Sequence, residues 1–275
     1  MFKIHLKDSI LDLSTPLVMG ILNATPDSFF EGSRMEQLDA GVKKAIEMAQ
    51  SGAGILDIGG QSTRPGAEII TEGIEIERVV PMIKAIHATL PNMPISIDTY
   101  HANVAKAALD AGASIVNDIS CGNFDPKMLP MVVANKAGYI GMHQTGSPST
   151  MHDVQDRKDI MTSLMDYFLD KKRQFEAIGL NQWIIDPGFG FSKTTAENFE
   201  LVKSLGQLKV LDLPILLGVS RKSSIYKTLG VDAKEALNGT TVVNTVGLMS
   251  GANILRVHDV KEAKEAIRLV NEMNA

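Results

Sequence analysis

Polar side chains that could recognise a small molecule recur at the ends of short apolar runs in this sequence. Carboxylate and amide groups can pair with the parallel N–H donors of a heterocycle with a 2-amino-4-oxo edge, such as a pterin or a guanine. Lys222 could donate to the carbonyl of such a ring, so the set predicts a pocket for a heterocyclic substrate. The polar residues at the run ends are Asn23, Asp57, Asp98, Asn117, Asp186, Lys222, Arg256 and His258.

Part of this set is also typical of an anion site. Arg256 and His258 are two positions apart in a predicted extended segment, so their side chains should point to the same side. Together with Asn23 and Thr63 they could hold a phosphate. Lys222 opens a predicted helix, whose first N–H groups favour an anion. A heterocycle edge and a phosphate site in one pocket predict a substrate that carries both.

Alternative interpretations of these polar residues stay open at this point. Asp and Asn oxygens suit Mg²⁺, whereas no spacing of His and Cys residues suits zinc. Each Asp or Asn alone could equally cap a helix, but seven polar run ends out of eight favour a shared pocket. The glycine-rich segments 57–67, 186–194 and 218–224 match neither a Walker A nor a Rossmann fingerprint, so they do not support ATP or NAD binding.

Eight short apolar runs must position these residues. They are nearly continuous and rich in β-branched residues, as strands buried on both faces of a parallel sheet are. Amphipathic stretches typical of helices separate the runs, and four of these stretches end in a glycine turn. The runs cover residues 16–23, 53–60, 93–99, 113–118, 137–143, 182–188, 213–220 and 252–259.

Eight strands that alternate with helices predict an α/β fold, a (β/α)₈ TIM barrel formed by one domain over residues 1–275. An open doubly wound sheet is the alternative, but no G-x-G-x-x-G follows the first strand and no linker divides the chain. Segment 1–15 predicts a short β-hairpin over the bottom of the barrel. Because barrel active sites lie at the carboxyl ends of the strands, the polar run ends should converge there.

The composition excludes several classes of function. The chain has 275 residues, of which 44% are hydrophobic, and a net charge of −5 with both signs mixed, so no nucleic-acid partner is expected. No apolar run approaches the length of a membrane span, and the N-terminus lacks the apolar core of a signal peptide. The single cysteine, Cys121, predicts a small buried side chain in a cytoplasmic protein without membrane contact.

Six motifs, in order and over residues 19–260, resemble those of the dihydropteroate synthases of the pterin-binding TIM-barrel superfamily. They are "MGILNATPDSFFEG", "DIGGQSTRPGA", "SIDTYHANVAKAALDAGASIVNDIS", "DPGFGFSKT", "GVSRKSS" and "ILRVHDV". The resemblance implies a Mg²⁺-dependent transferase that condenses a 6-hydroxymethyl-7,8-dihydropterin pyrophosphate with p-aminobenzoate, giving 7,8-dihydropteroate and pyrophosphate. It also implies a homodimer formed through late helices and inhibition by sulfonamides.

The same resemblance implies a role for individual residues. The pterin would be held by Asp98, Asn117, Asp186 and Lys222. The pyrophosphate would be held by Asn23, Thr63, Arg256 and His258, with Mg²⁺ bound near Asn23. The p-aminobenzoate would lie against Phe29, Arg64, Pro65, Phe191, Lys222 and Ser223. The catalytic residues would be Asp27, Glu31, Arg64 and Lys222. Either Asp27 or Glu31 would face a cationic carbon, and alignment with the family favours Glu31.

Two rival functions remain to be separated from this one. A pterin-binding methyltransferase domain would share the barrel but would need a corrinoid partner. A binding-only paralogue would keep the pocket without turnover, and its support is Glu31, which stands where the family usually has an aspartate.

For the synthase, the electron-rich dihydropterin and the neutral amine nucleophile favour an SN1-like displacement, in which a closed loop excludes water.

Overall fold

The computed structural model describes residues 2–24, 34–61, 68–155, 157 and 159–274, and its central sheet confirms the predicted barrel. Eight parallel strands lie in the order β8-β7-β6-β5-β4-β3-β10-β9. A parallel bridge between Ile185 and Ile215 joins the two ends of this order, so the sheet is nearly closed. The strands are β3 (Leu17–Asn23), β4 (Ile55–Gly59), β5 (Ile95–Asp98), β6 (Ile115–Asp118), β7 (Gly138–Met142), β8 (Ile184–Asp186), β9 (Leu216–Leu217) and β10 (Ile254–Val257).

The register of the strands aligns their polar carboxyl ends. Asn23, the last residue of β3, lies opposite Gly59 at the end of β4. Gly59 in turn lies opposite Asp98, and Asp98 lies opposite Asn117. The last residues of three strands and the penultimate residue of β6 therefore lie in one row at the mouth of the barrel. This alignment confirms that the polar run ends share one face of the fold.

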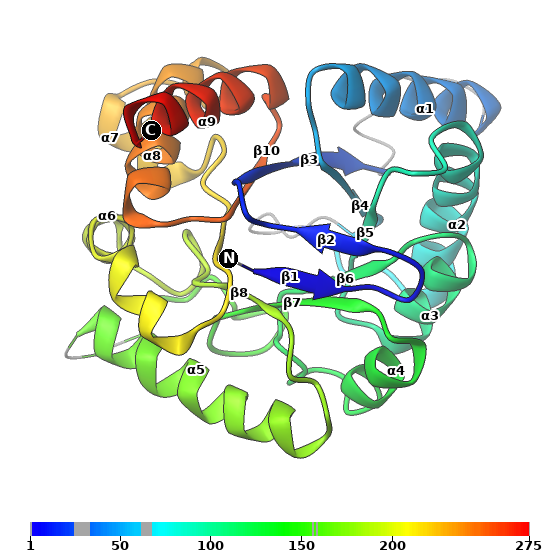
Figure 1. Ribbon diagram of the computed structural model, residues 1–275, viewed down its shortest axis with the longest axis horizontal. Coiled ribbons are helices and arrows are strands. Elements are labelled where there is room, and N and C mark those ends of the chain that lie inside the picture. Colours follow the sequence, from blue (N-terminus) through cyan, green and yellow to red (C-terminus); the bar gives the residue numbers. More distant parts are fainter. Residues whose placement is uncertain (1, 25–33, 62–67, 156, 158, 275) are drawn as a thin grey trace.

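Helices surround the strands, as Figure 1 shows along the barrel. Their inner faces pack on the outward-facing residues of the strands in one large apolar cluster, which includes Ile58, Ile97 and Leu217. The helices are α1 (Arg34–Gln50), α2 (Glu72–Thr89), α3 (Ala102–Asp110), α4 (Met128–Asn135), α5 (Ile160–Ala177), α6 (Thr195–Lys203), α7 (Ser223–Leu229), α8 (Leu237–Ser250) and α9 (Val260–Asn274), with the 3₁₀ turns η2 (Leu205–Leu211) and η3 (Ala233–Glu235).

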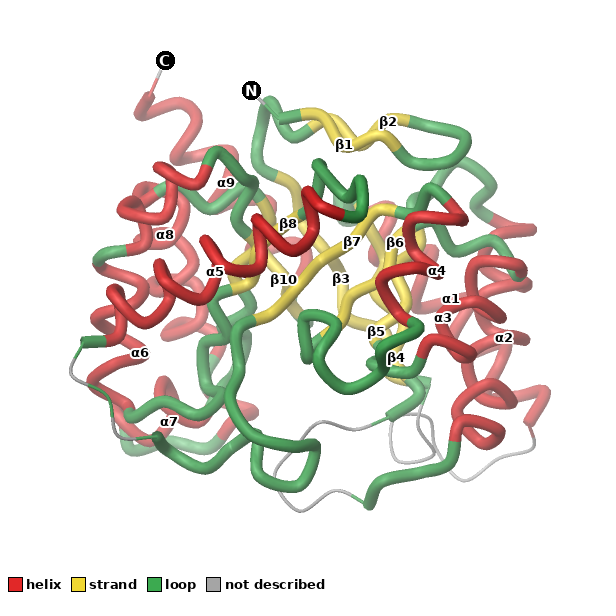
Figure 2. The backbone as a smooth tube through the Cα atoms, turned by 90° about the horizontal axis from the view of Figure 1, so that it is seen from below, coloured by secondary structure: helices red, strands yellow, loops and turns green. Residues whose placement is uncertain are grey.

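The predicted N-terminal hairpin closes one end of the barrel. Strands β1 (Lys3–His5) and β2 (Ile10–Asp12) pair antiparallel, and Figure 2 places them at the end opposite the loops that follow β4 and β5. Ile4 and Leu11 are 3% and 4% exposed and belong to an apolar cluster with Met19 and Ile55, which lie in the barrel interior. The hairpin therefore seals the bottom of the barrel, and the polar carboxyl ends lie at the other opening.

Two local expectations are also confirmed. Helix α7 begins at Ser223 with Lys222 as its N-cap residue, so Lys222 stands at the junction between β9 and a helix. Cys121 is fully buried and behaves as a small core residue. No helix within the described ranges is long and apolar enough to cross a membrane.

Candidate active site

A half-buried guanidinium joins two carboxylates at the mouth of the barrel. Arg256, from β10, donates from Nε to Asp57 Oδ2 at 2.6 Å and from Nη2 to Asp98 Oδ2 at 2.5 Å. Asn117 donates from Nδ2 to the same Asp57 oxygen at 3.1 Å. These bonds connect the ends of four strands, so they fix the relative positions of the residues that the sequence predicted to bind a ligand.

Asp57 is the most buried member of this network. Its side chain is fully inaccessible to solvent, and Oδ2 accepts both the guanidinium and the Asn117 amide. Its other oxygen, Oδ1, has no hydrogen-bond partner among the described residues. The sequence placed Asp57 at a strand end, which is wrong because Asp57 lies in the middle of β4, and it predicted no separate role for this residue. In the structure it anchors Arg256, a role that only the spatial pairing reveals.

The charges in the pocket shift one another's proton affinities. Burial raises the pKa of Asp98 to about 7, although Arg256 opposes the shift. Burial also raises the pKa of Asp186, against the effect of Lys222. Burial lowers the pKa of Lys222 to about 8. Burial works to lower the pKa of Arg256 as well, but the neighbouring carboxylates Asp57 and Asp98 raise it overall, so Arg256 stays charged.

Lys222 lies over the loop that follows β8. Its Nζ donates to the carbonyl of Phe189 at 2.5 Å and stands 4.7 Å from the centre of the Phe191 ring. Gly190 has a φ of +83°, and a Cβ there would lie 3.0 Å from Lys222 Cδ, so a glycine suits both the turn and the approach of the lysine. The structure therefore brings Lys222 and Phe191 together, as the p-aminobenzoate assignment requires.

Asp186 faces the same space from β8. Its Oδ1 accepts the N–H of Gly188 at 2.7 Å. Gly218 separates it from Arg256, because a Cβ at Gly218 would lie 3.9 Å from Asp186 Oδ2 and 3.8 Å from Arg256 Cβ. Asp186 and the Asp57–Arg256–Asp98 network therefore lie close together at the mouth of the barrel.

His258 lies further out, beside the loop that follows β9. Its Nδ1 and the Ser220 hydroxyl are 2.9 Å apart, and its backbone N–H donates to the same hydroxyl at 3.2 Å. Arg221 in that loop forms a bidentate pair with Asp259, with Nε to Oδ2 at 2.9 Å and Nη2 to Oδ1 at 2.8 Å. These contacts tie the end of β10 to the loop that carries Lys222, at the entrance to α7.

Several predicted site residues lie outside the described residues. They are Asp27, Phe29, Glu31, Thr63, Arg64 and Pro65. Their assigned roles therefore rest on the sequence. Among the residues that are described, no group of three or more His, Cys, Asp and Glu side chains is arranged to hold a metal ion.

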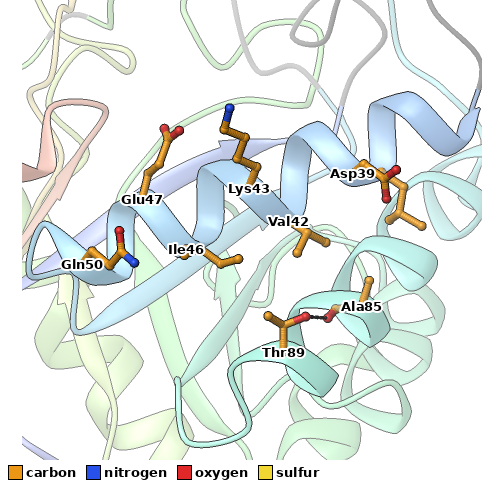
Figure 3. A pocket seen from close by; sticks show the side chains of 9 residues that line it. Asp39, Val42, Lys43, Ile46, Glu47, Gln50, Ala85 and Thr89 are labelled. Carbon is orange, nitrogen blue, oxygen red and sulfur yellow. Dashed lines mark hydrogen bonds between the residues drawn. The ribbon is translucent and has the colours of Figure 1, made fainter.

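A separate groove of about 650 Å³ lies on the outer wall of the barrel, between α1 and α2. Figure 3 shows Val42 and Ile46 of α1 pointing toward α2, while Lys43 and Glu47 of the same helix point away from it. None of the polar strand ends lines this groove. The chemistry of the molecule is therefore concentrated in the mouth of the barrel rather than in this groove.

Comparison with known proteins agrees with the geometry. The family model described as "Pterin binding enzyme" matches residues 19–258. A dihydropteroate synthase of Synechocystis is 43% identical over 260 residues, which cover 93% of this chain and 89% of the relative. This chain belongs to the dihydropteroate synthase family. It is therefore an enzyme of the transferase class, as the six motifs predicted.

Two solved synthases of this family have the same fold. A Xanthomonas albilineans dihydropteroate synthase with 4-aminobenzoic acid superimposes with a TM-score of 0.92 and 34% identity, over 99% of this chain and 98% of that one. A Yersinia pestis dihydropteroate synthase in a sulfonamide drug complex gives a TM-score of 0.91 with 37% identity, over 99% of both chains. The barrel and its hairpin therefore belong to the family architecture.

Replacing Arg256 by Gln should destabilise the protein in a pH-dependent way. Without the guanidinium, the pKa of Asp98 in the folded state rises further above its unfolded value of 3.8, so stability falls as pH rises through this interval. We expect R256Q to lose about 3 kcal/mol of unfolding free energy at pH 8 and less at pH 5, measured by urea denaturation. R268Q, at an exposed position of α9, should stay within about 0.5 kcal/mol of the parent protein at both pH values. An equal loss for R256Q at pH 5 and pH 8 would contradict this account.

Proposed function

We propose that the pocket at the mouth of the barrel condenses a 6-hydroxymethyl-7,8-dihydropterin pyrophosphate with p-aminobenzoate, forming 7,8-dihydropteroate and pyrophosphate. The observation that carries the proposal is the network of Arg256 with Asp57, Asp98 and Asn117, in a chain of the dihydropteroate synthase family. The related Xanthomonas enzyme was solved with 4-aminobenzoic acid, which supports this substrate.

Asp98, Asn117, Asp186 and Lys222 would hold the pterin. The two carboxyl groups have the oxygen acceptors that suit the amino group and ring N–H of the heterocycle, and Lys222 suits its carbonyl. Asp186 is 6% exposed and Asn117 is 4% exposed, so their hydrogen bonds to a ligand would form away from bulk water. In such an environment, leaving a hydrogen-bond acceptor without a donor costs binding free energy. The pocket therefore favours a ligand whose amino group and ring N–H can donate to these oxygens.

The p-aminobenzoate would lie against the Phe191 ring and Lys222, with Ser223 near its carboxylate. A flat aromatic amine can stack on Phe191, which is 7% exposed and already lies below the Lys222 ammonium. The roles of Phe29, Arg64 and Pro65 in the same subsite are proposed from the family resemblance. Sulfonamides would compete for this subsite, a proposal that the sulfonamide complex of the Yersinia relative supports.

Asn23, Thr63, Arg256 and His258 would bind the pyrophosphate, with Mg²⁺ beside Asn23. Asn23 Oδ1 and Asp98 Oδ2 lie 3.9 and 3.8 Å from the point where a Cβ of Gly59 would stand, so both oxygens lie near the end of β4. This donor set fits Mg²⁺, which is usually held by one or two protein oxygens together with phosphate and water. When bound, Mg²⁺ would neutralise charge on the leaving pyrophosphate.

The displacement would be SN1-like. The bond between the pterin methylene carbon and the pyrophosphate oxygen breaks first, and both bonding electrons leave with the pyrophosphate. The amine nitrogen of p-aminobenzoate then forms the new bond to carbon and loses one proton. Because this amine is neutral at pH 7, no strong base is required. Arg256 would stabilise the departing anion, and Asp27 or Glu31 is proposed to face the cationic carbon.

The assignment of the site is tested by three single variants, Asn23→Ala, Lys222→Ala and Arg256→Ala. Each removes one group that contacts a substrate in the proposal, so each should lower the rate of p-aminobenzoate-dependent pyrophosphate release by about 100-fold or more. A coupled pyrophosphate assay measures this rate, and R268A on the exposed side of α9 serves as the control. Near-normal rates in all three variants would overturn the site. Pyrophosphate release that does not depend on p-aminobenzoate, or the absence of any pyrophosphate release, would favour the methyltransferase or the binding-only alternative.

The order of bond breaking is tested by positional isotope exchange. In a substrate labelled with ¹⁸O in the bridge between carbon and phosphorus, an SN1-like step lets the label move to non-bridging positions of the same phosphate before the bond re-forms. We expect this exchange to occur in the absence of p-aminobenzoate. It can be measured by ³¹P NMR. The R256A variant should show little exchange, whereas complete retention of the label by the unmodified enzyme would indicate a concerted displacement.

We also propose that the chain forms a homodimer through α8. Val242, Val246 and Met249 lie on one face of this helix and are 56%, 41% and 67% exposed. Val210 in the adjacent η2 turn is 76% exposed and extends the apolar surface. Such a patch on an outer helix is typical of an interface between subunits.

Introducing a charge into this face should separate the subunits. In sedimentation velocity, the unmodified chain should have twice the mass of its 29.7 kDa monomer, and M249E should sediment as a monomer, because a carboxylate would be desolvated in an apolar interface. M35E, at a 73% exposed position of α1, should remain dimeric. A monomeric parent protein, or a dimeric M249E, would contradict the proposed interface.

A further inference from the structure

A buried lysine lies beneath the active-site loop that follows β8. Lys193 is 6% exposed and immediately precedes Thr194, the N-cap residue of α6. Its Nζ is 3.0 Å from the Gly188 carbonyl oxygen, 3.1 Å from the Phe191 carbonyl oxygen and 3.0 Å from His143 Nδ1. The substrate assignments above give this lysine no role.

The partners of Lys193 match a protonated amine. An ammonium group carries three N–H donors, and three acceptors lie within 3.1 Å of Nζ. Two of them belong to the loop after β8, and the third belongs to the loop after β7. They are backbone carbonyls and an imidazole nitrogen rather than a carboxylate. The contacts are therefore suited to holding two loops together.

The two loops approach each other closely at this point. Gly188 has a φ of +70°, and a Cβ there would lie 2.0 Å from the His143 carbonyl oxygen, so no other residue fits. Arg157 holds the same loop from another side by donating from Nη2 to the Ser192 carbonyl at 2.5 Å. The backbone of residues 187–192 is thus held by two cations, Lys193 and Arg157.

This loop carries the groups that position the substrate-binding side chains. The carbonyl of Phe189 accepts from Lys222, and the Phe191 ring lies below the Lys222 ammonium. The N–H of Gly188 donates to Asp186. A shift of the loop would move Phe191, which is assigned to p-aminobenzoate alone, together with its contact to Lys222, which is assigned to both substrates.

We propose that Lys193 is a positioning residue for the p-aminobenzoate subsite, whose ammonium group fixes the 187–192 loop and through it Phe191 and Lys222. The inference rests on the proposed function, because it concerns how one half of that site is kept in place. It assigns Lys193 no contact with substrate. The effect of losing the lysine should therefore fall on p-aminobenzoate binding more than on the bond-forming step.

The protonation of Lys193 should tune this contact near neutral pH. Burial, together with the nearby charge of Arg157, lowers its pKa to about 7. Burial also lowers the pKa of His143, so the imidazole is neutral and Nδ1 can accept. An amine has two N–H donors for three acceptors, so the loop should be held less firmly above pH 7. The other charged groups around Lys193 are Asp186, Lys222 and Glu197.

The first test compares Lys193→Met with Lys172→Met. Lys172 also donates to a backbone carbonyl, that of Leu211 at 2.8 Å, but it lies away from the pocket and is a matched control. We expect K193M to raise KM for p-aminobenzoate by about tenfold, with kcat and KM for the pterin substrate within about threefold of the parent values. K172M should change none of these constants.

The second test is the pH dependence of KM for p-aminobenzoate between pH 6 and pH 8.5. The unmodified enzyme should show KM rising as the pH passes 7, where Lys193 loses its proton. K193M should lack this rise and keep only the change near pH 8 that belongs to Lys222. Thermal unfolding establishes that the variants are folded. If K193M does not fold, Lys193→Arg, which cannot lose its proton, should fold and likewise lack the rise near pH 7.

The outcomes separate this inference from the proposed function. An unmodified enzyme that makes no dihydropteroate would overturn the function itself. An active enzyme in which folded K193M keeps the parent KM and pH profile, or in which KM rises equally for both substrates, would overturn the positioning role alone. Failure of both K193M and K193R to fold would overturn it as well, because the lysine would then serve the stability of the whole barrel.

Discussion

The pairing of Arg256 with Asp57 and Asp98 is the interaction on which the pocket depends. One guanidinium serves two carboxylates, and Asp57 has no access to solvent. Burying these charges separately would cost several kcal/mol for each ion, so they persist only because they satisfy one another. The pairing spans the barrel mouth from β10 to β4 and β5. It therefore fixes the relative positions of groups on three strands that are proposed to bind substrate or to hold those that do.

The two ends of the barrel share the same strands but differ in chemistry. At the bottom, the hairpin residues Ile4 and Leu11 pack on Met19 and Ile55, and this apolar cluster excludes water without any charged group. At the top, strands of the same sheet carry Asn23, Asp98 and Asn117 at or next to their last residues. Because the bottom supplies hydrophobic stabilisation, the top can hold buried charges that contribute little to stability but arrange a site.

The sequence was sufficient to predict the barrel, the hairpin and the set of polar strand ends. Apolar periodicity is local, and strand ends of a parallel barrel must share one face, so Asp98 and Asn117 could be placed together without a structure. The partner of Arg256 could not be predicted, because Asp57 is 199 positions away and the pattern does not distinguish one strand-end carboxylate from another. Lys193 gave no signal either, since a lysine beside a helix start is usually exposed.

The structure also reconciles two roles proposed for Arg256. It bonds to Asp98, assigned to the pterin, and it is assigned to the pyrophosphate as well. These roles are compatible because Nε and Nη2 make the carboxylate contacts, while Nη1 reaches no hydrogen-bond acceptor among the described residues. Asp98 likewise contacts Arg256 through Oδ2, so its Oδ1 can face a heterocycle. A guanidinium whose orientation is fixed by carboxylates can therefore present its remaining donors to a departing anion with little reorganisation, which is the condition for effective electrostatic stabilisation.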